Sequence, residues 1–321
     1  MNKNMIGVDI GGTKCAVSYG IMINNNLKII DKQRFATTTV RETIENILSG
    51  INKIMKKHDL TSSNTESVGI SCGGPLDSIK GIIMSPPNLP GWNKIPIVKT
   101  IEEKTGIKTA IQNDANACAL AEWKFGAGKG TQNMVFLTFG TGLGSGLILN
   151  GKLYSGTNDN AGEIGHIRLS EFGPVGYGKA GSFEGFVSGG GIAQLAKMKI
   201  REKLQMGESV EWCPEGKMES ITTKEVAEAA NLGDKFAKSI FDLSSSYLGK
   251  GLAMIIDILN PEMIVIGSIY TRNEKLIRPI MIKTIEKEAL LLARNVCTIK
   301  PAELGEQIGD YAALSVAVNI I

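Results

Sequence analysis

The chain has 321 residues, with 35 basic and 32 acidic side chains and a formal net charge of +3. This balance does not favour nucleic acid or a membrane surface as a partner, and no apolar run approaches the roughly 20 residues of a membrane span. The first strand pattern begins almost at once, which leaves no room for a signal peptide, and the five scattered cysteines include no Cys-x-x-Cys pair. We therefore expect a cytoplasmic protein with free thiols.

The first strand, at residues 4–9, runs into the glycine-rich sequence DIGGT at 9–13, and a second strand follows at 15–22. Glycines let a backbone turn tightly and approach an anion, so its N–H groups and the threonine hydroxyl can donate to phosphate oxygens. Alone, such a turn is more often a plain hairpin connection. A second loop of the same kind makes nucleotide binding the better interpretation.

The next segments alternate strands and helices, with a rigid loop at 85–92 (SPPNLPGW) among them. The expected elements are a strand at 27–37, a helix at 41–58, a strand at 67–72, a helix at 97–105 and a strand at 107–112.

Asp114 follows the strand at 107–112 and opens an alanine-rich helix at 115–125. The carboxyl end of a strand is where α/β folds place their sites, and a helix N-terminus keeps a carboxylate ionised. Asp114 could therefore accept the proton of a hydroxyl that attacks a phosphoryl group. Alone, a helix cap would be the better interpretation, but two phosphate loops favour catalysis.

The second half repeats the theme with strands at 134–137 and 146–149 around the sequence TFGTGLG at 138–144. Hairpins, crossover helices and parallel strands that occur twice predict two related α/β domains around a central cleft. The remaining elements are helices at 223–231, 234–259 and 274–292, strands at 263–266 and 296–299, and a terminal helix from 306. We expect a smaller domain from residues 1–114 plus 306–321 and a larger one from 115–305.

The sequence NAGEIGH at 160–166 holds Glu163 and His166, which share one face if the turn is helical. These side chains could bind sugar hydroxyls, or they could be part of a metal site that lacks its other ligands.

Five motifs in this order resemble the ROK family of bacterial sugar kinases and sugar-responsive repressors. They are the sequences at residues 9–13, 88–92 (NLPGW), 113–117 (NDANA), 140–144 (GTGLG) and 162–166 (GEIGH). The resemblance runs from residue 5 to about 190, with a weaker echo at 260–267. It implies two actin-like (ribonuclease H-like) domains, a small-molecule sugar and ATP as substrates, and a homodimer.

The resemblance also implies site residues, with Asp114 as the catalytic base that deprotonates the sugar 6-hydroxyl. The positions that match sugar contacts are Gly74, Asn88, Asn113, Asp114, Glu163, His166 and Glu184. The positions that match nucleotide contacts are Gly11, Gly12, Thr13, Thr141, Gly142 and Gly267. Asp9 matches the carboxylate that supports Mg²⁺ and its water shell.

The family's zinc site is the main departure. Its three cysteines are replaced here by Val175, Tyr177 and Ser182, so His166 lacks the partners that a four-ligand zinc site needs. We therefore expect no zinc, and we expect packing by Tyr177 and Phe183 to order this loop instead.

These observations predict an ATP-dependent kinase for the 6-hydroxyl of a hexose or N-acetylhexosamine. The sequence at 113–130 and the missing zinc ligands favour N-acetylmannosamine, with glucose as the alternative. A repressor is disfavoured because only eight residues precede Asp9 and no basic recognition helix is visible. A sugar sensor without catalysis stays open, and ADP release with and without sugar separates it from a kinase.

Overall fold

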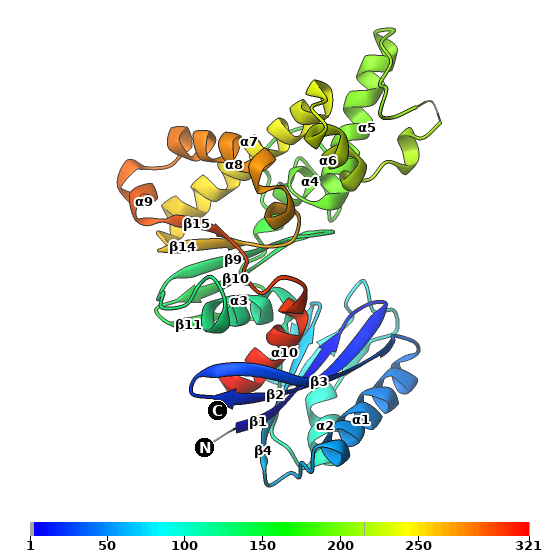
Figure 1. Ribbon diagram of the computed structural model, residues 1–321, viewed down its shortest axis with the longest axis vertical. Coiled ribbons are helices and arrows are strands. Elements are labelled where there is room, and N and C mark those ends of the chain that lie inside the picture. Colours follow the sequence, from blue (N-terminus) through cyan, green and yellow to red (C-terminus); the bar gives the residue numbers. More distant parts are fainter. Residues whose placement is uncertain (1–2, 215, 321) are drawn as a thin grey trace. The chain divides into compact units, whose positions relative to one another are not determined.

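The computed structural model describes residues 3–214 and 216–320, and the chain forms two compact units (Figure 1). The first unit contains the chain up to Gln132, Gly146–Ala161 and the chain from Glu303, and the second contains Asn133–Ser145 and Gly162–Ala302. Both units combine strands with helices, as the predicted α/β class requires. The expected domain boundaries at 114/115 and 305/306 stay a prediction.

The first unit is built on a five-stranded sheet of order β3-β2-β1-β4-β8. Its strands are β1 (Lys3–Ile10), β2 (Lys14–Ile23), β3 (Asn26–Ala36), β4 (Thr65–Cys72) and β8 (Thr109–Asn113). The first three are antiparallel neighbours, whereas β1, β4 and β8 run parallel. Because the register pairs Ile10 with Cys72 and Cys72 with Asn113, the carboxyl ends of the three parallel strands lie level with one another. The carboxyl ends of parallel strands are where such folds place their sites.

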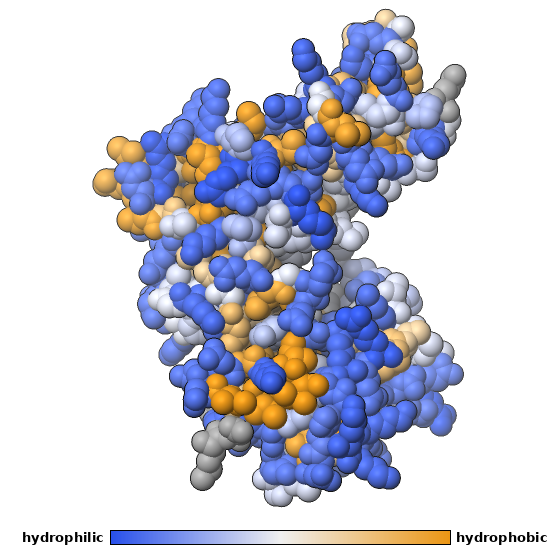
Figure 2. All heavy atoms as spheres, in the orientation of Figure 1, coloured by the Kyte–Doolittle hydropathy of each residue, from blue (hydrophilic) through white to orange (hydrophobic). Residues whose placement is uncertain are grey.

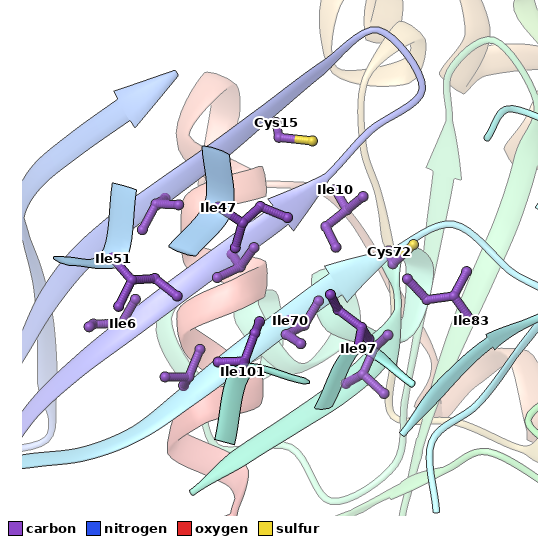
Figure 3. Packing of buried hydrophobic residues seen from close by; sticks show 14 of the residues in the cluster. Ile6, Ile10, Cys15, Ile47, Ile51, Ile70, Cys72, Ile83, Ile97 and Ile101 are labelled. Carbon is purple, nitrogen blue, oxygen red and sulfur yellow. The ribbon is translucent and has the colours of Figure 1, made fainter. Parts of the chain in front are cut away.

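One face of the sheet packs against α1 (Val40–Lys57) and α2 (Ile97–Thr105). Figure 3 shows isoleucines of both helices packed against isoleucines of β1 and β4, and the side chains of Ile47, Ile70 and Ile101 are fully buried. This interdigitation stabilises the sheet edge through burial of apolar surface.

The opposite face packs against α10 (Ile308–Asn319), since Met5 clusters with Leu314 of that helix. A Cβ on Gly69 of β4 would lie 2.2 Å from the carbonyl oxygen of Ala313. The missing side chain therefore lets α10 lie directly on the strand. A three-stranded sheet consists of β5 (Leu76–Asp77), β6 (Ile82–Met84) and β7 (Asn93–Ile95). The other elements of this unit are the helix α3 (Asp114–Phe125), the antiparallel strands β10 (Leu143–Leu149) and β11 (Lys152–Tyr154), and the 3-10 turn η3 (Gly305–Gln307).

In the second unit, β9 (Met134–Phe139), β14 (Met263–Ile266) and β15 (Thr298–Pro301) are parallel neighbours. The 25-residue helix α7 (Lys235–Leu259) begins at an Asp234 cap. The remaining elements are η1 (Ile164–His166), β12 (Val175–Gly176), β13 (Lys179–Ala180), α4 (Phe183–Phe186), α5 (Gly189–Gln205), η2 (Met218–Ser220), α6 (Thr223–Asn231), α8 (Ile269–Glu288) and α9 (Leu291–Val296). The chain passes into the first unit within β10, whose start belongs to the second unit.

The structure confirms most of the predicted elements but adds α5, which the sequence analysis missed. This helix opens with three glycines, which are poor helix formers. A Cβ on Gly191 would lie 2.0 Å from the carbonyl oxygen of Gly185, so close packing onto α4 requires glycine there. The helix expected at 274–292 begins earlier, at Ile269, and ends at Glu288.

Hydrophilic residues cover much of the face shown in Figure 2, and apolar residues gather over α9, among other places. Leu290, Leu291 and Leu292 at the start of this helix are all exposed. Over the residues that the structure describes, no helix has both the length and the apolar character that a membrane crossing needs.

Candidate functional site

The first glycine-rich loop joins β1 to β2, as predicted. The Gly11 N–H donates to the Lys14 carbonyl at 3.2 Å, which closes the turn. A Cβ on Gly12 would lie only 2.5 Å from the carbonyl oxygen of Asn88, so this loop packs directly on the Pro-rich loop. Thr13 is exposed at the tip. The loop therefore presents backbone and a hydroxyl with no bulky side chain in front of them.

Two amide side chains flank Gly73-Gly74, just beyond the end of β4. A Cβ on Gly73 would lie 3.3 Å from the side-chain amide atoms of Asn88, and one on Gly74 would lie 3.0 Å from Asn113 Nδ2. Amides offer both donors and acceptors, as recognition of hydroxyl groups requires. The structure thus brings Gly74, Asn88 and Asn113 together at the sheet edge.

Asp114 is the first residue of α3, and Asn113 is its N-cap. The Ala115 N–H donates to Asn113 Oδ1 at 2.9 Å and to Asp114 Oδ1 at 2.8 Å. The Asp114 side chain keeps access to solvent. Desolvation by surrounding protein raises the pKa of this carboxyl, while the Ala115 N–H opposes that rise. A carboxylate whose proton affinity is raised but which stays open to solvent is suited to accept a proton.

Asp9 lies near the end of β1 in an electrostatically crowded place. Burial, followed by the carboxylates of Asp310 and Asp114, raises its pKa to about 6, while Lys32 and Lys14 oppose the rise. Lys32 Nζ lies 2.5 Å from the Asp310 carboxylate, and a Cβ on Gly309 would lie 3.1 Å from Asp9 Oδ2. The sequence analysis missed Lys32 and Asp310, since 278 residues separate them and neither belongs to a motif.

The second glycine-rich loop joins β9 to β10 and contacts Glu184 of α4. The Gly140 N–H donates to the Gly142 carbonyl at 3.1 Å. The Leu143 N–H donates to Glu184 Oε2 at 3.0 Å, and a Cβ on Gly142 would lie 2.8 Å from the same oxygen. Thr141 is exposed at the turn. A predicted sugar-binding carboxylate therefore touches a predicted phosphate loop.

Glu163 and His166 flank Gly165, which packs against the second glycine-rich loop. Glu163 precedes the 3-10 turn η1, and both side chains are exposed. A Cβ on Gly165 would lie 2.3 Å from the Leu143 carbonyl oxygen and 3.4 Å from Glu184 Cβ. The second unit thus brings the segment of Glu163 and His166 close to Glu184 and the second glycine-rich loop. The turn that the shared face required is a 3-10 turn over Ile164–His166, with Glu163 as its N-cap.

A cavity of about 770 Å³ opens beside the second glycine-rich loop. Gly140 and Thr141 line one part, and α5, α6 and the start of α8 line the rest. Ser268 and Ile269 are among the lining residues, whereas Gly267 is buried and faces Phe136 and Ala302. The cavity combines a predicted phosphate loop with apolar walls, as nucleotide sites do.

The segment 166–185, where the zinc site was expected to be lost, is held by hydrogen bonds. Lys179 Nζ donates to the His166 carbonyl at 2.7 Å, and the Gln194 amide exchanges two hydrogen bonds with the Val175 backbone, of 3.0 and 2.9 Å. Within 3–214 and 216–320 the structure has no cluster of three or more His, Cys, Asp or Glu side chains arranged to hold a metal.

Two aromatic side chains were expected to order this segment, and only one of them does. Phe183 is fully buried and packs on Gly251, where a Cβ would lie 2.2 Å from the ring. Tyr177 is 75% exposed, so it does not supply the packing that was expected to order this segment. Tyr177 occupies the tip of the β12–β13 hairpin, where a side chain cannot reach the core.

The chain was compared with known proteins. The profile described as "ROK family" matches residues 5–319. A glucokinase of Halalkalibacterium halodurans is 33% identical over 95% of this chain and 92% of its own length. The structure of a ROK family glucokinase from Streptomyces griseus, in complex with glucose and AMPPNP, is 29% identical with a TM-score of 0.75 and covers 98% of this chain and 99% of that one. A ROK hexokinase structure from Thermus thermophilus is 25% identical with a TM-score of 0.80 and covers 100% and 99%.

Proposed function

Since the chain belongs to the ROK family, we propose that it is an ATP-dependent sugar kinase that phosphorylates the 6-hydroxyl of glucose. The observation that carries this proposal is the Asp114 carboxylate, open to solvent at the start of α3 beside the amides around Gly73-Gly74. A repressor or sensor that only binds sugar needs the amides but not a base of raised proton affinity.

In this mechanism the 6-hydroxyl oxygen of the sugar attacks the γ-phosphorus of ATP while Asp114 accepts the hydroxyl proton. The bond from the γ-phosphorus to the oxygen that bridges it to the β-phosphorus breaks, and ADP leaves with that oxygen. The raised pKa of Asp114 favours proton transfer, and the N-terminus of α3 stabilises the charged form before transfer. Asn88 and Asn113 orient the sugar, and Glu163, His166 and Glu184 bind sugar hydroxyls. Correct orientation is itself a large part of such a rate enhancement.

The glycine-rich loops hold the phosphates of ATP. Gly11, Gly12 and Thr13 form one loop, and Thr141 and Gly142 form the other, next to the cavity that would take the nucleoside. Since Gly267 faces Phe136 and Ala302, its role is to support Ser268 and Ile269 in that cavity wall.

Magnesium accompanies ATP and neutralises phosphate charge. The Asp9 carboxylate fits this ion, because it lies beside a phosphate loop and offers hard oxygen ligands directly or through water. We propose no zinc, since His166 has none of the thiolates that a structural zinc site uses.

We propose glucose as the substrate, although the sequence alone favoured N-acetylmannosamine. The reported relatives are a glucokinase, a glucokinase bound to glucose and a hexokinase, and they support a plain hexose. N-acetylmannosamine stays the second candidate on the sequence at 113–130.

The test is ADP release by the purified protein with a panel of hexoses and N-acetylhexosamines. We expect glucose to give the highest kcat/KM. A higher value for N-acetylmannosamine would assign that sugar instead. Sugar binding in calorimetry without ADP release would identify a non-catalytic sensor and refute the kinase proposal.

We also propose that the protein acts in the cytoplasm, where ATP is supplied.

We further propose that the chain forms a homodimer, and sedimentation of the purified chain tests this. Limited proteolysis tests the domain boundaries expected at 114/115 and 305/306.

A further inference from the structure

Tyr177 projects an exposed aromatic ring beside His166. The two ring centroids lie 6.3 Å apart and the ring planes meet at 76°, so the edge of one ring faces the other. Tyr177 is 75% exposed, although large aromatic side chains are usually buried. The ring therefore contributes little to the stability of the folded chain, and its place beside a proposed sugar ligand calls for another explanation.

The backbone at Tyr177 is also unusual for its residue type. Tyr177 and Gly178 connect β12 to β13 with φ values of 44° and 73°. A two-residue hairpin turn with both φ values positive favours Asn-Gly, and a bulky side chain in this region is strained. The chain thus keeps tyrosine where asparagine would fit the turn better, and such local strain is typical of functional positions.

The hairpin is held in place next to His166. Lys179 Nζ donates to the His166 carbonyl, and Gln194 clamps Val175 through two hydrogen bonds. The Lys179 bond ties the turn to His166, and the Gln194 bonds tie it to α5, so the ring has a defined position relative to His166. A preorganised aromatic surface binds a ligand at a low cost in side-chain entropy.

The chemistry of the pair matches a pyranose. A sugar ring has polar hydroxyls at its rim and a face of C–H groups, which packs against aromatic rings. His166 can bind a hydroxyl, while the ring of Tyr177 supplies an apolar wall with a polar tip.

We propose that Tyr177 is a sugar-binding residue whose ring packs against the C–H face of the sugar that Glu163 and His166 bind. This inference rests on the proposed kinase function. The contact is the same before and during phosphoryl transfer, so its loss raises the sugar KM and leaves kcat unchanged.

Three variants test the contact. Tyr177→Asn removes the ring and suits the positive φ of the turn, so it relaxes the backbone while it deletes the sugar contact. Tyr177→Phe keeps the ring. Phe172→Ala is the matched control, since Phe172 is 86% exposed in the same segment and belongs to no proposed site.

We expect Tyr177→Asn to raise the KM for glucose by about 10-fold, with kcat, the KM for ATP and the melting temperature preserved or improved. Tyr177→Phe keeps the ring face, so its KM for glucose should rise far less than that of Tyr177→Asn. Phe172→Ala should behave as wild type. An unchanged KM in Tyr177→Asn would overturn the proposal, as would an equal rise in Phe172→Ala, because the effect would then come from loop order.

Different measurements test the kinase proposal and the sugar contact of Tyr177. A wild-type protein that phosphorylates no sugar refutes the kinase proposal. Sugar binding measured by calorimetry, without nucleotide, then still decides whether Tyr177→Asn weakens the site.

Discussion

Replacing Gly12 by alanine should disable the first phosphate loop without unfolding the protein. Gly12 does not have a positive φ, so alanine suits its backbone, and the effect comes from space alone. The new Cβ would lie 2.5 Å from the carbonyl oxygen of Asn88, whereas ordinary contact begins at 3.4 Å. The loop or the Asn88 backbone must therefore move by about 0.9 Å.

A displacement of about 1 Å in an active site can cost on the order of 100-fold in rate. We therefore expect Gly12→Ala to lower kcat/KM by about that factor for both glucose and ATP. Both substrates are affected because the clash displaces the loop proposed to bind ATP, or Asn88, which is proposed to bind the sugar. The assay is steady-state ADP release with each substrate varied in turn. Gly233→Ala is the control. A Cβ at this position meets open space, but the backbone φ of 98° is strained for alanine. The variant should therefore lower the stability of the fold and leave kcat/KM unchanged. Retention of half the wild-type kcat/KM by Gly12→Ala would refute the reasoning.

The remaining predictions concern the carboxylates and the metal. Asp114→Asn should lower kcat by about 10²–10⁴-fold with ATP binding preserved, and a variant with more than a tenth of wild-type turnover would show that Asp114 is not the base. The pKa of Asp9 is raised to about 6, so the folded chain favours the protonated form of this carboxyl. Its ionisation therefore destabilises the fold fully above about pH 6, and the effect disappears below about pH 4, where the carboxyl is protonated in the folded and the unfolded chain. Asp9→Asn should accordingly raise the free energy of unfolding at pH 7 by up to about 3 kcal/mol in urea titrations while it abolishes activity. In the wild type, the Mg²⁺ concentration for half-maximal activity should rise as the pH falls from 7 to 5, and a flat response would contradict the role of Asp9. Elemental analysis should find no stoichiometric zinc, and activity should survive chelation once Mg²⁺ is restored; one zinc per chain would mean unrecognised ligands.

The sequence by itself determined the features that depend on a few neighbouring residues. The hairpin loops at 9–13 and 138–144 lie at strand ends as predicted, because glycine turns between apolar runs are encoded locally. Asp114 opens α3 beside an Asn113 cap for the same reason, since a cap needs only the side chain and the next turn of backbone.

Only the tertiary structure decided which distant segments meet. The contact of Gly12 with Asn88 and the pairing of Lys32 with Asp310 beside Asp9 depend on how α10 and the Pro-rich loop pack against the sheet. Helix α5 forms although its opening glycines disfavour it, and one of these glycines, Gly191, allows the close approach to α4, since that approach leaves no room for a Cβ. The exposure of Tyr177 likewise follows from its place at a hairpin tip, although the sequence analysis had expected its packing to order this loop. Packing between segments far apart in sequence overrides local propensity, since it is there that most of the burial energy arises.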